Sequence, residues 1–171
     1  MVSQSSSADS GLIHATAIAN GRHCALLRGP SGIGKSDLAL RCLATPPIEG
    51  LTTAPLQLVA DDQVELKRAT AEGRVKLIAA PPLALTGLIE IRGIGIARVA
   101  HVAPVDVGLV IDLVASGETA SIARMPPDPL ATETLLGTEV PRIELDPREA
   151  SAPMKVAAAL ATLCGERDPP G

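Results

Sequence analysis

The segment Gly29-Pro30-Ser31-Gly32-Ile33-Gly34-Lys35-Ser36 matches the pattern G-x-x-x-x-G-K-S/T at every fixed position. Glycines let a backbone turn several N–H groups toward one anion, and the start of a following helix adds the positive end of its dipole. Lys35 is placed to reach the β- and γ-phosphates of a nucleotide, and the Ser36 hydroxyl is placed to ligate Mg²⁺. A chance match is expected in roughly 0.5% of chains of this size. The stretch therefore predicts a site for nucleotide phosphates.

The segments on either side of this loop support the same interpretation. Residues 24–27 form a short apolar run, which is typical of a strand buried on both faces. Residues 37–43 have a helix-forming composition that Pro46-Pro47 ends. A buried strand before the loop and a helix after it are the setting that a phosphate loop requires.

Apolar runs of strand length outnumber helical segments in the whole chain. Strands are expected at residues 12–18, 24–27, 56–60, 64–66, 75–79, 88–91, 105–114 and 140–145. The run at 105–114 is the longest and should be a central strand. A last helix is expected between Ser151, at its N-cap, and Gly165. These elements predict a strand-rich α/β fold rather than an alternating Rossmann pattern.

The expected elements fill one domain, which we place at residues 11–165. Residues 1–10 are rich in serine and are expected to be a disordered tail, and residues 166–171 are expected to be a flexible C-terminal tail. The first residues also lack the cationic start and apolar centre of a secretion signal.

The composition excludes several classes of function. The net charge of −4 argues against a general nucleic-acid binder, and the absence of Phe, Tyr and Trp removes the rings that stack on bases. The chain has no run of about 18 apolar residues, so no membrane span is expected. Cys24, Cys42 and Cys164 are scattered, which favours free thiols in a reducing compartment. We therefore expect a cytoplasmic protein that binds neither nucleic acid nor membrane.

Two sets of carboxylates compete for the metal or the base role. Asp61-Asp62 follows the expected strand at 56–60, where one acid could contact Mg²⁺ while the other faces an acceptor. The alternative is an Asp-rich turn. Asp112 is the rival, because four apolar residues and an acid at 109–112 resemble the metal-binding strand of a general nucleotide hydrolase. The residues alone leave this choice open.

Other polar residues are ambiguous when each is taken alone. Glu90 and Arg92 stand just before Gly93 and Gly95. This segment is either a mobile active-site loop or a charged strand end followed by a loose turn. His14 lies in an apolar strand, where a single histidine is more often structural. Arg124, taken alone, is a solvated loop residue.

Taken together, three motifs in order resemble the catalytic domain of bacterial HPr kinase/phosphorylase. They are the phosphate loop, the Leu58-Val-Ala-Asp-Asp62 strand end and Ile89-Glu-Ile-Arg-Gly-Ile-Gly-Ile96, with His14 ahead of them. The resemblance covers about Leu12 to Cys164. It implies a phosphate-loop kinase domain related to phosphoenolpyruvate carboxykinase, in a short form without the family's N-terminal domain.

The resemblance also implies a function. It is that of an ATP- and Mg²⁺-dependent serine kinase, acting on a small phosphocarrier protein (HPr or a relative) of the sugar phosphotransferase system, within a homo-oligomer, a hexamer in the family. Pyrophosphate is the alternative donor. The family's basic, glycine-containing segment before the last helix is reduced here to residues 146–153, so we expect little phosphorylase activity. The alternatives are a nucleotide-sensing regulator without kinase activity and a general nucleotide hydrolase.

The resemblance assigns roles to single residues. Asp62 is expected to accept the serine proton. The further catalytic residues it implies are Lys35, His14, Arg92 and Arg124. Its implied Mg²⁺ ligands are Ser36, Glu90 and Asp61. Asp112 becomes a structural residue of its strand.

Overall fold

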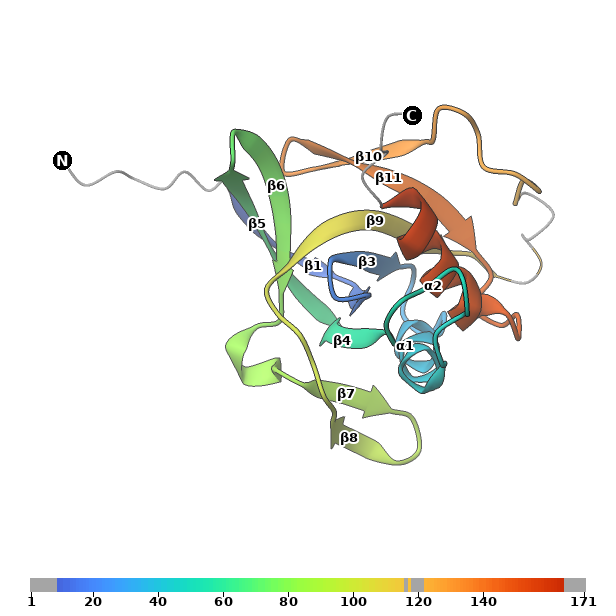
Figure 1. Ribbon diagram of the computed structural model, residues 1–171. Coiled ribbons are helices and arrows are strands. Elements are labelled where there is room, and N and C mark those ends of the chain that lie inside the picture. Colours follow the sequence, from blue (N-terminus) through green and yellow to red (C-terminus); the bar gives the residue numbers. More distant parts are fainter. Residues whose placement is uncertain (1–8, 116, 118–121, 165–171) are drawn as a thin grey trace.

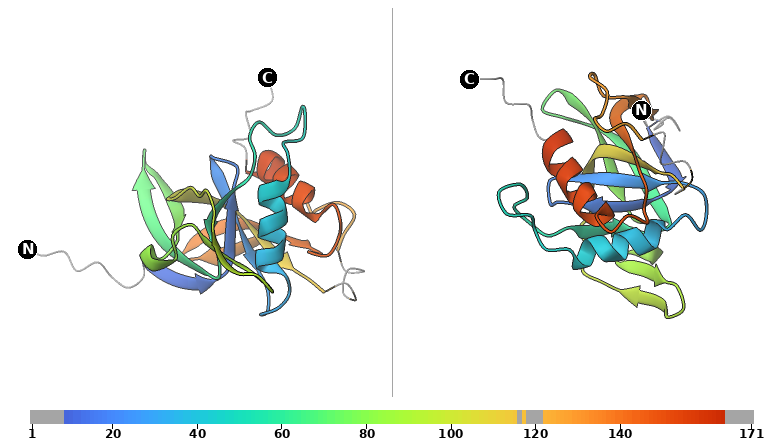
Figure 2. Two further views of the ribbon diagram at one scale, coloured as in Figure 1. Left: turned by 90° about the horizontal axis from the view of Figure 1, so that it is seen from below. Right: turned by 90° about the vertical axis from the view of Figure 1, so that its right-hand side faces the viewer.

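A computed structural model of the chain describes residues 9–115, 117 and 122–164. Two helices, α1 (Lys35–Ala44) and α2 (Ala152–Leu163), lie next to each other on one face of a large, curved sheet (Figures 1 and 2). A small two-stranded sheet projects from the body beside α1 (Figure 1). No helix among these residues is long and apolar enough to span a membrane.

The main sheet has nine strands within the described residues. They are β1 (Ser10–His14), β2 (Thr16–Ala19), β3 (His23–Arg28), β4 (Gln57–Ala60), β5 (Gln63–Ala71), β6 (Arg74–Ala80), β9 (Val105–Leu113), β10 (Thr132–Leu135) and β11 (Thr138–Leu145). Their order is β1-β5-β6-β9-β3-β2-β4, with β11 beside β9 and β10 beside β11. The second sheet is the hairpin of β7 (Leu88–Ile91) and β8 (Gly95–Arg98), which follows a short 3₁₀ helix, η1 (Leu83–Leu85).

One of the parallel strands, β3, leads into the phosphate loop. β9 pairs in parallel with β3 on one side and with β11 on the other, whereas the remaining pairs are antiparallel. The carboxyl ends of these three strands therefore meet at one edge of the sheet, which is where open α/β sheets place their ligands. The prediction of a central strand at residues 105–114 is confirmed.

Both faces of the sheet are covered, and side-chain alternation in β3 shows how. Ala25 and Leu27 belong to the apolar cluster under α1 and α2, while Cys24 and Leu26 belong to the cluster on the opposite face. All four residues are fully buried, so the prediction of a strand buried on both faces is confirmed. The core is aliphatic, and the three cysteines are free thiols.

The expected strand at residues 12–18 is wrong in one respect, because it is two strands. β1 pairs with β5, and β2 pairs with β3 and β4. Between them the Ala15 N–H donates to the Asp62 carbonyl oxygen over 3.2 Å. The chain changes partners at this point, which brings His14 to the Asp61-Asp62 turn.

The first strand begins earlier than expected, because Ser10 already belongs to β1. Helix α2 has Ser151 at its N-cap, as predicted, and ends at Leu163 with Cys164 as its C-cap. Residues 1–8 and 165–171, which hold most of the expected tails, lie outside the described part of the chain.

Candidate active site

The phosphate loop joins β3 to α1 at the carboxyl edge of the sheet. Gly29 has a φ of +151°, and a Cβ there would meet Ile33 Cγ2 at 3.0 Å and the Leu113 carbonyl oxygen at 3.2 Å. Gly34 is the N-cap of α1, with a φ of +110°, and no side chain caps that end. The first N–H groups of a helix lack partners within the helix, so this end is open to an anionic ligand.

Lys35 begins α1 and bends back over the loop. Its ammonium donates to the carbonyl oxygens of Gly29 over 2.8 Å and Pro30 over 3.2 Å, and the residue is only 7% exposed. Burial lowers the pKa of Lys35, and the nearby charges of Asp62 and Asp61 oppose that shift. A desolvated ammonium held by neutral carbonyls is a strong site for phosphate oxygens, which would compensate its charge.

The Asp61 carboxylate is buried where β4 ends, and three donors hold it. Ser36 Oγ donates to Oδ1 over 2.7 Å, and Thr16 Oγ1 donates to the same oxygen over 2.8 Å. The backbone N–H of Glu90 donates to Oδ2 over 3.0 Å. Asp61 therefore links the start of α1, strand β2 and the hairpin β7–β8.

The Asp62 carboxylate, unlike that of Asp61, points into solvent at the mouth of the site. Its side chain is 61% exposed, and Oδ1 lies 3.1 Å from His14 Nδ1. Asp62 has a φ of +68°, a left-handed conformation that aspartate tolerates better than most residues. The tight Asp61-Asp62 turn thus sends one carboxylate inward and the other outward.

These residues line one pocket of about 380 Å³. Its lining is His14, Ser31, Gly32, Gly34, Lys35, Ser36, Asp37, Leu40, Asp62, Glu90, Ile91 and Arg92. The pocket brings together the predicted residues from four separate segments, including Glu90 and Arg92 of the hairpin. Asp61 lies directly beneath it, through its bond to Ser36.

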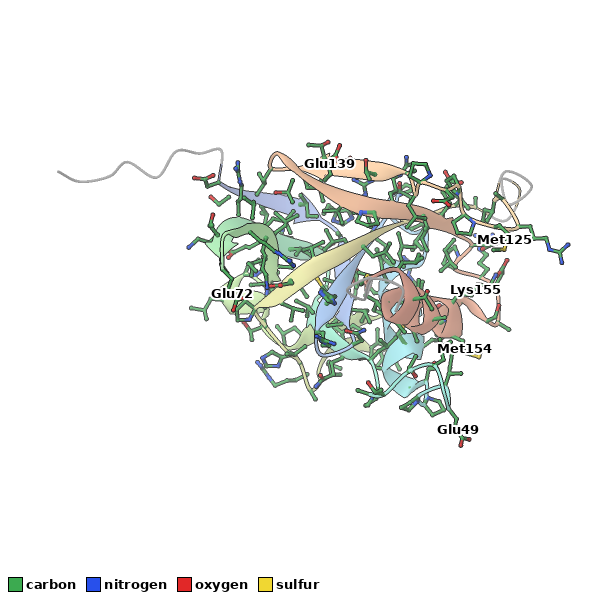
Figure 3. The ribbon with its side chains drawn as sticks, turned by 45° about the horizontal axis from the view of Figure 1, so that its top comes forward. Glu49, Glu72, Met125, Glu139, Met154 and Lys155 are labelled. Atoms are coloured by element: carbon green, nitrogen blue, oxygen red, sulfur yellow. The ribbon has the colours of Figure 1, made fainter. Side chains whose placement is uncertain are left out.

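Arg124 is not brought to this pocket. It is exposed and lines a second hollow of about 530 Å³ together with Arg142 and Lys155, between β11, α2 and the segment that precedes β10. Figure 3 shows its neighbour Met125 and Lys155 on the same side of the molecule. A catalytic role for Arg124 stays a prediction that the geometry does not support.

Asp112 also lies outside the pocket, in a network of arginines. Arg28 donates to its carboxylate from Nε over 2.9 Å and from Nη2 over 3.1 Å, and Arg142 donates to Oδ2. Arg28 reaches Glu133 as well, at 3.2 Å. Burial opposes ionisation of Asp112, but the hydrogen bonds from Arg28 and Arg142 outweigh it and lower the pKa of this carboxyl. Asp112 is therefore engaged with arginines, as the resemblance implies for a structural residue.

We expect Asp112→Asn to lower the free energy of unfolding by about 1–3 kcal/mol at pH 7, because two arginines lose a charged acceptor. Because the pKa of Asp112 is lower in the folded state, its ionised form stabilises the protein fully at pH values above the ordinary pKa of 3.8. This contribution is lost as the pH falls through the lowered pKa. Urea unfolding from pH 7 down to pH 3 measures it, and the difference from wild type should shrink in acid.

Glu139→Gln is the matched control for this variant, because Glu139 is exposed on β11 and points away from the body (Figure 3). Its unfolding free energy should follow wild type at every pH. An Asp112→Asn variant as stable as wild type at neutral pH would remove the structural role given to the arginine network.

The sequence interpretation missed Thr16, Arg28 and Glu133. Thr16 carries the one available signal, because a single hydroxyl stands in the apolar run Ala15–Ile18 two residues after His14. Arg28 and Glu133 carry no such signal, because Arg28 is 84 residues from Asp112 and still farther in sequence from Glu133. Only the pairing of β3, β9, β11 and β10 brings these residues together.

The residues present suit Mg²⁺ bound with a nucleotide rather than a metal bound by protein alone. Residues 9–115, 117 and 122–164 contain no group of three or more His, Cys, Asp or Glu that could hold an ion. Mg²⁺ usually takes one or two protein oxygens, substrate phosphates and water. The Ser36 hydroxyl, set by a buried carboxylate at 2.7 Å, and Glu90 on the pocket wall fit that pattern.

A strand, a loop of this pattern and a helix, with one buried and one exposed carboxylate beside them, form part of a mixed α/β, strand-rich domain. Comparison with known families identifies it further. The family model described as the HPr Serine kinase C-terminal domain matches residues 6–162, and the chain belongs to this family. The chain is also similar to the solved structure of the Hpr(Ser) kinase/phosphatase from Coxiella burnetii, with 30% identity and a TM-score of 0.67 over 87% of this chain and 88% of that chain.

Proposed function

We propose that this chain is an ATP- and Mg²⁺-dependent protein-serine kinase that phosphorylates a small phosphocarrier protein, HPr or a relative, of the sugar phosphotransferase system. One observation carries the proposal. Asp62 lines the same pocket as Lys35 and Ser36, and its Oδ1 is engaged by His14 at 3.1 Å. The second carboxylate oxygen is left to accept a proton at the mouth of a phosphate site. Membership of the HPr serine kinase family supports the same conclusion.

The transfer step follows from this arrangement. The bond from the acceptor serine oxygen to the γ-phosphorus forms as the bond from that phosphorus to the β,γ-bridging oxygen breaks, and ADP leaves. The serine proton passes to the free oxygen of Asp62. His14 orients Asp62, and Lys35 with the N-terminus of α1 offsets negative charge on the phosphates. Most of the acceleration in such reactions comes from positioning and charge stabilisation.

Mg²⁺ would be held by Ser36 and Glu90, with Asp61 fixing the Ser36 hydroxyl. When bound, the ion supplies charge neutralisation for the β- and γ-phosphates. Arg92, beside Glu90 on the hairpin, is a second positive group on the pocket wall. Pyrophosphate could use the same contacts as ATP, because none of them involves a base.

The rim of the pocket supports a protein acceptor rather than a small molecule. Ile94 and Ile96 of the hairpin are 81% and 74% exposed, Ile94 in its turn and Ile96 paired with Glu90 across the two strands. Exposed apolar side chains at the rim of a site are typical of a surface that a protein covers. We further propose, from the family alone, a cytoplasmic homo-oligomer.

The direct test is transfer of label. The full chain, incubated with Mg²⁺ and γ-labelled ATP, should place acid-stable label on one serine of a phosphocarrier protein from its host, and none on the Ser→Ala form of that acceptor. Folded protein that binds the nucleotide but labels no phosphocarrier would contradict the kinase and favour the nucleotide-sensing regulator. Little release of label from phosphoserine in the presence of phosphate is expected, since residues 146–153 lack the family's basic segment.

A further inference from the structure

We propose that Thr16 is a positioning residue of the phosphate-transfer site, which holds Asp61 so that this carboxylate ties the hairpin β7–β8 to the phosphate loop. The proposal deepens the proposed function and rests on it only in taking the pocket as a site for a magnesium nucleotide. It starts from a buried hydroxyl that the transfer step does not use.

The contacts of Asp61 give the first step. The residue is 5% exposed, and its buried carboxylate accepts three hydrogen bonds, with the Lys35 ammonium as a nearby opposite charge. Oδ1 accepts from Thr16 and Ser36, and Oδ2 accepts from the Glu90 N–H. Rotation of the carboxylate would disturb all of these bonds together.

The three donors differ in how firmly they are held. Thr16 is fully buried on β2, between β3 and β4, and a β-branched side chain has few rotamers. Ser36 lies at the start of α1, where its hydroxyl also has to serve the ligand, and Glu90 lies on a hairpin outside the main sheet. Thr16 is therefore the most firmly held of the three donors, and its hydrogen bond fixes the orientation of the Asp61 carboxylate.

The consequence reaches the catalytic groups. Glu90 and Arg92 line the pocket from the hairpin, and Glu90, which would hold Mg²⁺, is also the residue whose N–H donates to Asp61. Loss of the Thr16 donor frees Asp61 to turn. The Ser36 hydroxyl and the Glu90 backbone then both lose a fixed acceptor, although neither residue has changed.

A purely structural hydroxyl is the competing explanation, and the chain offers a matched control for it. Thr138 Oγ1 is buried at the start of β11 without any hydrogen-bond partner, and β11 lies on the other side of β9 from β2. Thr138→Val makes the same chemical change as Thr16→Val in the same fold. Thr138 is not among the residues that line the pocket.

The test uses the full chain and two measurements that need no acceptor protein. Isothermal titration with ATP, with and without Mg²⁺, measures the metal-dependent part of the affinity, and amide hydrogen exchange by NMR follows the Glu90 N–H. We expect Thr16→Val to weaken Mg·ATP binding about tenfold and to speed exchange of the Glu90 amide about tenfold, with Mg²⁺-free ATP binding within about twofold of wild type. Thr16→Ser should restore both, and Thr138→Val should match wild type.

Each outcome decides the proposal. A Thr16→Val protein with wild-type Mg²⁺ dependence and wild-type Glu90 exchange would overturn it, and equal losses in Thr138→Val would do so too. If Thr16→Val does not fold, Thr16→Cys against Thr16→Ser gives the same comparison, because a thiol is a weak donor. A wild type that binds Mg·ATP but transfers no phosphate would refute the proposed kinase activity. The exchange rate of the Glu90 amide in Thr16→Val would still test the positioning role of Thr16.

Discussion

Asp62→Asn is expected to lower phosphoryl transfer to the acceptor serine by about 10³-fold while Mg·ATP still binds with an affinity near that of wild type. The amide keeps the size of the carboxylate and a partner for His14, but it cannot take up a proton. Asp62 is 61% exposed and its carboxylate contacts His14 rather than a residue of the phosphate loop, so nucleotide binding should survive. Single-turnover transfer with labelled ATP, beside a nucleotide titration, measures both effects.

Two control variants sharpen this result. Glu65→Gln removes an exposed carboxylate from β5, the strand that follows Asp62, but lies outside the pocket and should keep full activity. Asp112→Asn addresses the general nucleotide hydrolase. A loss of metal-dependent hydrolysis in Asp112→Asn with normal transfer in Asp62→Asn would reverse the roles given to these two acids.

The residues at the centre of the candidate site could be picked out from the sequence because their signals are local. A phosphate loop needs glycines, a lysine and a hydroxyl in one short stretch, and β3 and α1 flank it as expected. The Asp61-Asp62 strand end is also a local pattern. What sequence spacing could not show is that the two acids diverge, with Asp61 5% exposed and Asp62 turned to solvent through a left-handed φ.

The rest of the fold depends on pairing between distant segments, which local patterns do not contain. For Gly93 and Gly95 the sequence left a mobile loop and a loose turn after a strand open, and in the structure they lie at the turn of a hairpin whose strand β8 pairs with β7. Strand β10 follows a proline-rich segment and forms only because β11 provides an edge for it. Arg28 and Asp112 lie 84 residues apart and meet because β3 and β9 are parallel neighbours in register.

Lys35→Met is expected to have opposite effects on binding and on stability. Removal of the ammonium should weaken Mg·ATP binding by about 100-fold, since a desolvated charge–phosphate contact contributes about 3 kcal/mol. In the nucleotide-free protein the same change should leave the melting temperature unchanged or raise it. Burial lowers the pKa of Lys35, so its charged form is less favourable in the folded state than in the unfolded chain.

The sign of the stability effect follows from linkage. A lysine whose pKa is lowered on folding destabilises the protein at neutral pH, and this cost disappears as the pH rises toward the ordinary value of 10.5. Thermal unfolding with and without Mg·ATP therefore separates the two roles, because wild type should gain a nucleotide-dependent rise in melting temperature that Lys35→Met lacks. Lys67→Met, at an exposed position on β5, is the control and should keep that rise. A Lys35→Met protein that still shows the full rise would mean that this ammonium does not bind the phosphates. The site would then need another cation, for which Arg92 on the pocket wall is a candidate.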